Sequence, residues 1–187
     1  MLSIMRLRYL LLLAALLPLA ACDDNAADEW EVNVDSVTLY SASRPANLGR
    51  ASTLDFANWI PFPVETPGVT GRWDVAVTDA SGTISLVPAS AFSGLDSRAA
   101  IATIGNRVLE EVESAPSDTS AYKRTAVAMQ LHTVYVIRTR RVDCGFGSGV
   151  RYGKFEPIEI DPVNGVLRIR SIVNPFCNSR DLIPNNN

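Results

Sequence analysis

The chain has 187 residues, of which 47% are hydrophobic and 20% are charged, with a formal net charge of −3. This length suits one domain with a sizeable core, and the slightly acidic balance does not favour a nucleic-acid-binding protein. With one histidine, three cysteines and no C-x-x-C spacing, the chain also lacks the ligand sets of common zinc sites.

Residues 1–21 have the order of a secretory signal peptide. Arg6 and Arg8 give a positive start, and residues 9–21 form an uncharged run rich in Leu and Ala. This run is too short to cross a hydrocarbon core, which takes about 20 residues in a helix. A positive start, a short apolar run and small residues before a cut point predict export of the chain.

The end of this segment, Leu19-Ala20-Ala21-Cys22, resembles the bacterial lipobox. The resemblance implies cleavage after Ala21 and a diacylglyceryl thioether on Cys22, whereas the alternative is an ordinary signal peptide with an incidental cysteine. Each buried methylene contributes about 0.8 kcal/mol, so two or three acyl chains hold a protein on a membrane almost permanently. We therefore expect a lipid-anchored protein of the bacterial cell envelope, on the inner or outer membrane, whose domain faces the periplasm or the exterior.

Residues 22–31 are acidic and show no apolar periodicity, which predicts a flexible tether between the lipid and the folded body. Residues 32–184 are expected to form a single β-rich domain. Charge is uneven along the exported chain, because residues 22–120 carry 15 acidic and 5 basic side chains and residues 121–187 carry 5 and 10. This asymmetry favours ion pairs within the protein.

The first half of the domain shows strand patterns separated by turns. Residues 30–40 alternate as a strand with a slip near Ser36, and residues 41–71 read as a packed loop with one short strand. A hairpin is predicted over residues 72–78 and 83–87, with Trp73, Val75 and Val77 on one face. Residues 88–97 are expected to form a loop with a helical turn.

Residues 99–113 are ambiguous. Ile101, Ile104, Val108 and Val112 recur at helical spacing, whereas Gly105-Asn106 interrupts the middle and could divide the segment into strand, turn and strand. We predict one short helix around residues 106–113. The expected fold class is mainly β, built from antiparallel sheets with at most one short helix.

The clearest structural pattern lies near the C-terminus, where residues 133–141, 150–160 and 166–173 are three strand-like runs. The segment 161–165 (Asp-Pro-Val-Asn-Gly) supplies turn residues between the last two. The runs predict a three-stranded antiparallel meander. Because its first and third strands end on the same side, Cys144 and Cys177 come together, and an oxidising compartment predicts a disulfide between them.

Four arginines are candidate ligand-binding residues on this sheet. Alternation places Arg138 with Arg140, and Arg168 with Arg170, on one face of their strands. Such a face suits a carboxylate, phosphate or polysaccharide. The alternative is neutralisation by Glu156, Glu159 and the acidic N-terminal half of the chain.

His132, the single histidine, is a further candidate ligand-binding residue. A hydrolase would need it beside an activated serine, but the chain has no G-x-S-x-G sequence. Gly145–Gly149 reads as a hairpin loop and not as a phosphate-binding loop, because no helix follows it. The sequence therefore predicts no catalytic residues and no metal ligands.

A family resemblance supports the same fold class. Trp73–Val77, Val134–Thr139 and Arg151–Phe155 look like segments of exported bacterial lipoproteins, and Asn174–Leu182 resembles their C-terminal ends. More distantly, residues 70–182 are similar to the HmuY-like haem-binding lipoproteins, which are predominantly β. Those carriers hold iron with two His or with His and Met, and this chain offers His132 and Met129.

The sequence thus predicts a non-enzymatic envelope lipoprotein with a binding or structural β-domain. Its expected partners are the membrane, through the N-terminal lipid, and a protein or small-molecule ligand, but not nucleic acid. No resident cofactor is expected. The alternative is a carrier of haem or of another small anionic ligand, and a hydrolase is the third hypothesis.

Overall fold

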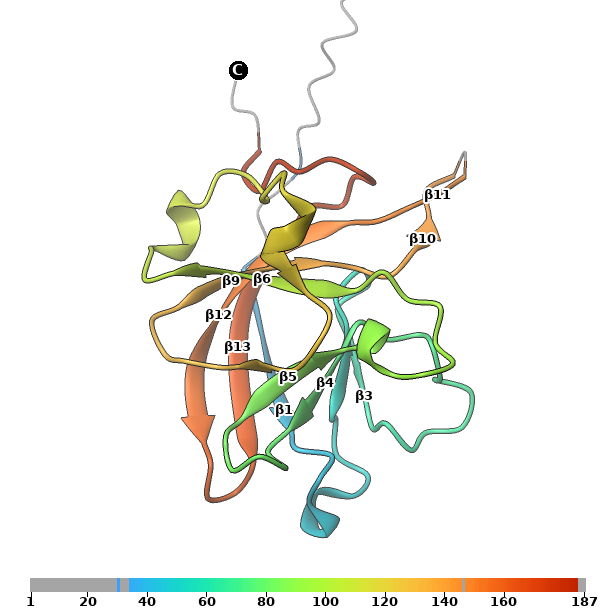
Figure 1. Cartoon of the computed structure of the whole chain (residues 1–187), viewed down its shortest axis with the longest axis vertical. Coiled ribbons are helices and arrows are strands. Elements are labelled where there is room, and N and C mark those ends of the chain that lie inside the picture. The colour runs from blue at the N-terminus through green and yellow to red at the C-terminus, as the bar shows by residue number, and fades with distance from the viewer. Residues whose placement is uncertain (1–29, 31–33, 146, 185–187) are drawn as a thin grey trace, which may run out of the picture. The chain divides into compact units, whose positions relative to one another are not determined.

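Two antiparallel sheets of six and five strands, with a separate two-stranded ribbon, make up the fold of the computed structural model (Figure 1). The structure describes residues 30, 34–145 and 147–184, and Trp30–Pro184 forms one compact unit. Helical structure in these residues is limited to four short 3-10 turns: η2 (Pro45–Asn47), η3 (Ala89–Ala91), η4 (Leu109–Glu111) and η5 (Thr119–Ala121). The mainly β class predicted from the sequence is confirmed.

The six-stranded sheet has the order β1-β13-β12-β9-β6-β7. The predicted meander forms its centre, because β12 pairs with β9 on one side and with β13 on the other. The turn at residues 161–165 connects β12 to β13, as the sequence predicted. The bounds are β1 (Asp35–Tyr40), β6 (Ala100–Gly105), β7 (Tyr122–Lys123), β9 (Val134–Arg138), β12 (Tyr152–Asp161) and β13 (Val166–Val173).

The five-stranded sheet has the order β3-β2-β4-β5-β8. Its centre is the predicted hairpin, in which β4 pairs with β5 through Val77↔Leu86 and its neighbours. The bounds are β2 (Thr53–Asp55), β3 (Ile60–Phe62), β4 (Val75–Thr78), β5 (Ser85–Pro88) and β8 (Val127–Ala128). The two-stranded ribbon is β10 (Val142–Asp143) with β11 (Ser148–Gly149).

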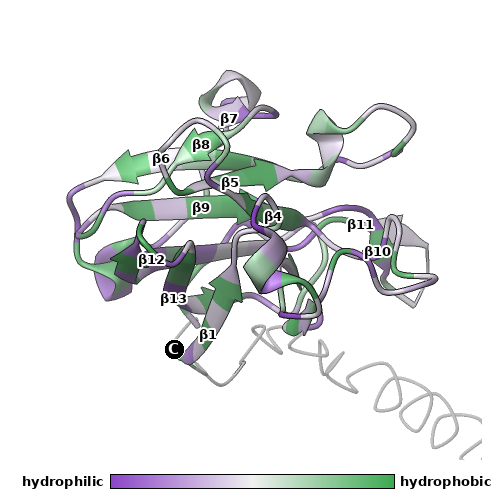
Figure 2. Cartoon of the chain, turned by 90° about the horizontal axis from the view of Figure 1, so that it is seen from below, coloured by the Kyte–Doolittle hydropathy of each residue, from purple (hydrophilic) through white to green (hydrophobic). Residues whose placement is uncertain are grey.

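The main core lies between the two larger sheets and takes residues from both. Hydrophobic residues are concentrated in the strands of these sheets (Figure 2). Strand alternation explains the composition of the core, because every second residue of a strand points to the same side. In β9, Tyr135 and Ile137 enter this core, whereas Val134 and Val136 join a second cluster on the other side of the sheet.

Two segments cover that second side of the six-stranded sheet. Residues 109–115 and the C-terminal residues 180–182 lie together, because Ala115 N donates to Arg180 O and Leu182 N donates to Glu113 O. Lys154 is fully buried beneath them and donates through Nζ to the carbonyls of Glu110 and Val112. Burial lowers the pKa of Lys154, against the influence of the nearby Glu110 and Glu113 carboxylates.

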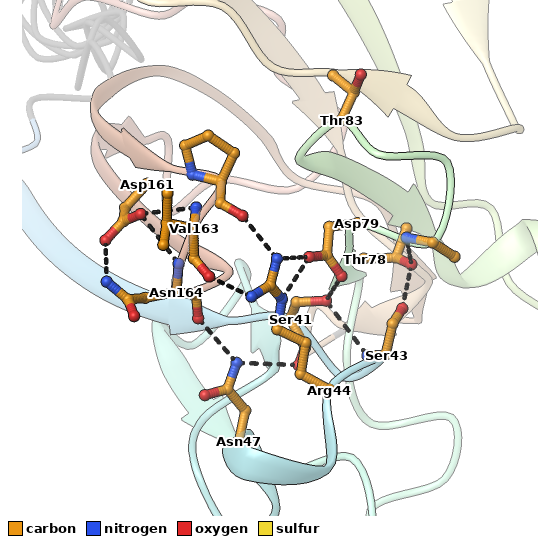
Figure 3. A network of polar contacts seen from close by, with 12 residues as sticks. Ser41, Ser43, Arg44, Asn47, Thr78, Asp79, Thr83, Asp161, Val163 and Asn164 are labelled. Carbon is orange, nitrogen blue, oxygen red and sulfur yellow. Dashed lines mark hydrogen bonds and ion pairs between the residues drawn. The ribbon is translucent and has the colours of Figure 1, made fainter.

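The two sheets are joined where β1 ends. Tyr40 N donates to Ala51 O, and Ala42 N donates to Val77 O, so the chain after β1 bonds to the five-stranded sheet. Arg44 then links Asp79 to the carbonyls of Pro162 and Val163 in the β12–β13 turn (Figure 3). This network fixes one end of the molecule, while β1 begins and β13 ends at the other.

Three local predictions require correction. Residues 106–113 form no α-helix, because β6 continues to Gly105, whose φ of 104° favours glycine, and only the 3-10 turn η4 follows. Residues 41–71 contain two short strands, β2 and β3, and not one. Trp73 does not share a face with Val75 and Val77. Because β4 begins only at Val75, Trp73 lies with Ala76 in a separate cluster on the outer side.

Among the described residues, no helix has the length and apolar character needed to cross a membrane. The signal segment 1–21, Cys22 and the tether residues 23–29 and 31 lie outside the residues that the structure describes.

Candidate functional site

The turn between β2 and β3 is held by two buried carboxylates. Asp74 is fully buried, and its Oδ2 accepts hydrogen bonds from Phe56 N at 2.8 Å and Ala57 N at 3.4 Å. Asp55 accepts from Asn58 N at 3.1 Å and from Asn58 Nδ2 at 2.8 Å. The backbone of residues 56–58 is therefore fixed by side chains.

Arg140 supplies the charge that these carboxylates require. Its Nη1 and Nη2 bind the two oxygens of Asp55 at 2.7 and 2.8 Å, and Nη1 lies 3.3 Å from Asp74 Oδ2. Its backbone N also donates to Asp74 Oδ1 at 2.6 Å. A bidentate guanidinium–carboxylate pair is among the stronger charged contacts in proteins. Arg140 therefore connects the end of β9 to β2 and β4.

Burial dominates the titration of Asp74. Removal of the carboxylate from water raises the pKa of Asp74 to about 6, although the Arg140 guanidinium and the amide donors lower it. Arg140 itself has a raised pKa, because its hydrogen bonds to Asp55 and the Asp74 charge outweigh the effect of its own burial. The cluster is thus a charged assembly in a mostly apolar setting.

Trp59 follows in a backbone conformation that is unusual for its side chain. Its φ is 55°, in the left-handed region that favours glycine. Its indole contacts Phe56 edge to face, with 5.6 Å between the ring centroids. Since a bulky residue rarely adopts this conformation, the fixed turn before it and the ring contact together hold Trp59 in place.

A cavity of about 250 Å³ opens beside Trp59, between the β2–β3 turn and the end of the six-stranded sheet where β1 begins and β13 ends. We call it the Trp59–Arg151 pocket. Its aromatic walls include Trp30 and Phe56. Asp35, Asn58, Ser171 and Arg151 add polar groups. A concave, partly aromatic site with a few convergent polar groups is typical of small-molecule binding sites.

Arg151 is anchored at one side of the pocket. Its Nη1 donates to Ala57 O at 2.6 Å, while its backbone N donates to Thr139 Oγ1 at 2.8 Å. Within the described ranges, Arg151 Nε is the one buried side-chain polar atom with no hydrogen-bond partner. Buried donors in native proteins are nearly always satisfied, so this one requires a structural or functional explanation.

The disulfide between Cys144 and Cys177 is close in sequence to two residues that line this pocket, Arg151 and Pro175. Its sulfur atoms are 1.99 Å apart and its Cα atoms 6.0 Å apart, which confirms the pairing predicted from the meander. Pro175, two residues before Cys177, lines the pocket. Asn178 N donates to Val150 O beside Arg151. The disulfide therefore fixes the C-terminal segment against the start of β12.

The structure separates Arg138 from Arg140, which alternation placed on one face. Arg138 donates through Nε to Arg98 O, and its guanidinium lies 5.2 Å from the centre of the Tyr122 ring. Arg140 instead turns to Asp55 and Asp74, because β9 ends at Arg138 and the chain is no longer a regular strand. The prediction of a shared face is wrong for this pair.

Arg168 and Arg170 lie opposite acidic residues of β12. The register pairs Glu159 with Arg168 and Glu156 with Arg170. Arg170 forms ion pairs with Glu156 and, at 3.1 Å, with Glu110. These contacts support the alternative, in which acidic residues on neighbouring strands neutralise the arginines. Arg140 is neutralised as well, by Asp55 and Asp74 from the acidic N-terminal half of the chain.

His132 is exposed and has a φ of 59° in the turn before β9. It lines a second surface pocket with Glu156, Arg170 and Glu111. Met129 lies in the main core with an exposed fraction of 4% and does not line that pocket. The structure therefore does not bring His132 and Met129 together as a pair of iron ligands.

The sequence analysis did not single out the residues that hold the β2–β3 turn. Asp55 and Asp74 stand between apolar neighbours, as Leu54-Asp55-Phe56 and Trp73-Asp74-Val75. A carboxylate between apolar residues of a strand-like sequence needs a partner when it is buried, so this pattern could have indicated a buried ion pair. The position of Arg151 beside Trp59 has no local signal, since 92 residues separate them.

No group of three or more His, Cys, Asp or Glu side chains in the part of the chain that the structure describes is arranged to hold a metal ion. Comparison of the sequence with models of known protein families and with curated proteins finds no match.

Proposed function

We propose that this protein is a lipid-anchored lipoprotein of the bacterial cell envelope whose β-domain binds a ligand without catalysing a reaction. The observation that carries the proposal is the separation of the three cysteines by role. Cys144 and Cys177 form a disulfide, which suits an oxidising exported compartment. Cys22, in its lipobox-like setting, is then available as the lipid acceptor.

The binding role is supported by the Trp59–Arg151 pocket. Its walls offer indole rings, a guanidinium, a carboxylate, an amide and a hydroxyl group. His132, the single histidine of the chain, lines a different pocket, where no serine or cysteine of the described residues accompanies it. Neither of these two pockets therefore assembles a serine–histidine pair of the hydrolase kind from the described residues.

The lipid anchor is tested by replacing Cys22 with Ser in the full chain. We expect the wild-type protein to sediment with membranes and to incorporate radiolabelled palmitate, because acylation takes place on the Cys22 side chain and on the new amino terminus. The Cys22→Ser protein is expected to lose the label and to leave the membrane fraction.

The matched control is the double variant Cys144→Ser/Cys177→Ser, which removes the disulfide but keeps the lipid acceptor. It is expected to retain both the label and membrane sedimentation. Membrane sedimentation of the Cys22→Ser protein, or loss of the label only in the double variant, would contradict the proposal.

A further inference from the structure

We propose that the Trp59–Arg151 pocket binds a small carboxylate that carries a single ring, with the carboxylate on Arg151 and the ring against the indole of Trp59. This inference deepens the proposed binding function and rests on it. It concerns a different surface from the Arg168–Arg170 face, where Arg170 already forms ion pairs with Glu156 and Glu110 and Glu159 pairs with Arg168 in the strand register.

The first argument is charge. Among the described arginines, Arg44, Arg140 and Arg170 form ion pairs with carboxylates, and the others form none within 4.0 Å. Arg151 differs from these others because it lines the pocket. Asp35 lines the same pocket and does not come within that distance of Arg151. A half-buried guanidinium without a counter-ion is suited to receive one from an anionic ligand.

The second argument is the geometry of the donors on Arg151. Ala57 O occupies Nη1, so Nε and Nη2 have no hydrogen-bond partner among the described residues. These two groups form the edge of a guanidinium that pairs side-on with the two oxygens of a carboxylate. Among the described residues Nε is shielded from water and unpaired, so a shift of the Arg151 side chain toward a bound carboxylate would expose this donor and satisfy it.

The third argument is the aromatic wall. Trp59 is held in a left-handed conformation beside Phe56, and Trp30 also lines the pocket. Backbone strain of this kind is concentrated at ligand-binding and active sites. Because aromatic rings favour stacked or edge-to-face contacts, the wall suits a flat, apolar ring.

The size of the cavity restricts the ligand to one ring. Its volume of about 250 Å³ falls below the roughly 300–1,000 Å³ of pockets that hold drug-sized molecules. Asn58 and Asp35 at the pocket lining can accept hydrogen bonds from substituents on the ring.

The experiment uses the full-length protein purified in dodecyl maltoside, with benzoate as the probe. Benzyl alcohol keeps the ring without the charge, and acetate keeps the charge without the ring. Binding is measured by calorimetry and by the change in tryptophan fluorescence. We expect benzoate to bind at least tenfold more tightly than either benzyl alcohol or acetate.

Variants assign this binding to the pocket. Arg151→Gln is expected to weaken benzoate binding at least tenfold. Arg168→Gln, an exposed arginine opposite Glu159, is expected to leave it unchanged. Trp59→Gly removes the indole and relieves the left-handed backbone, so it should weaken binding at least fivefold. Near-ultraviolet circular dichroism verifies that each variant is folded, and Arg151→Lys provides a charge-retaining second variant, expected to bind between the wild type and Arg151→Gln.

The inference is overturned if benzoate does not bind, if acetate or benzyl alcohol binds as tightly, or if folded Arg151→Gln and Arg151→Lys both bind like the wild type. Failure of this experiment differs from failure of the proposed anchor, because membrane sedimentation of the wild type and of Cys22→Ser does not depend on the pocket.

Discussion

Asp74 shows how one buried side chain can couple the stability of the protein to pH. Its carboxyl group is fully buried, and burial raises its pKa from an ordinary value of 3.8 to about 6. Between these two pH values the folded protein binds the proton more tightly than the unfolded chain does. The stability contributed by Asp74 is therefore complete below about pH 4 and is lost as the pH rises through about 6.

Replacement of Asp74 with Asn tests this coupling. We expect the free energy of unfolding of the wild type, measured with urea and taken relative to Asp74→Asn, to fall by up to about 3 kcal/mol between about pH 4 and pH 7. The exposed Asp96→Asn protein is the control and should follow the wild type. A difference between wild type and Asp74→Asn that stays constant or grows with pH would contradict the assignment.

At the scale of elements, the β12–β13 turn depends on a close contact between two loops. Gly165 has a φ of 68°, and a Cβ atom added there would lie 2.7 Å from Arg44 Nε and 3.1 Å from Ser41 Cβ. Arg44 cannot move freely, because it holds Asp79 and two carbonyls of the turn (Figure 3). The glycine is thus required by both backbone conformation and space.

Gly165→Ala is therefore expected to lower the free energy of unfolding by about 2–4 kcal/mol, through left-handed strain and displacement of Arg44. Gly82→Ala is a matched control, because Gly82 has a φ of 80° but nothing within 4 Å of the added Cβ. It should lose only about 1–2 kcal/mol, from the backbone alone. Equal losses in urea unfolding of the two variants would show that Arg44 is not displaced.

The elements also show how far the sequence alone could predict the fold. The meander and the β4–β5 hairpin were predicted because alternation and turn residues are local properties of the chain. The helix predicted over residues 106–113 is wrong. The apolar residues that recur at helical spacing between 101 and 112 do not share one face, because they are buried on different sides of a sheet. Ile101 lies in the main core, whereas Val112 covers the other side of the same sheet.

At the scale of the whole molecule, the disulfide covalently joins two segments near the pocket, the one before β11 and the one after β13. The 33-residue separation between Cys144 and Cys177 encloses the strands β11, β12 and β13. We expect Cys144→Ser/Cys177→Ser to lower the free energy of unfolding by about 3–4 kcal/mol. Urea unfolding with and without a reductant checks this result.

The reductant should destabilise the wild type by a similar amount and leave the double variant unchanged. An unfolding midpoint of the wild type that does not respond to complete reduction would show that the disulfide adds no stability.

The candidate site is built from segments that are far apart in the chain, and only part of it could be predicted from the sequence. Arg140 was identified from its sequence pattern as a candidate ligand-binding residue, but its guanidinium is occupied by Asp55 and holds the β2–β3 turn. Arg151 received no such role, although it reaches the Trp59 pocket. Strand alternation predicts the face of the sheet to which a side chain points. It does not predict which loop packs against that face.

The sequence by itself determined the β class, the order of the C-terminal strands, the disulfide partners and the expectation of a lipid anchor at Cys22. Each of these depends on short-range patterns, on the direction of neighbouring strands or on the chemistry of one segment. Only the tertiary structure decided that Asp55, Asp74 and Arg140 form one buried network and that Trp59 and Arg151 line one pocket. These residues are brought together by the packing of two sheets, and no local pattern encodes contacts between segments so far apart in the chain.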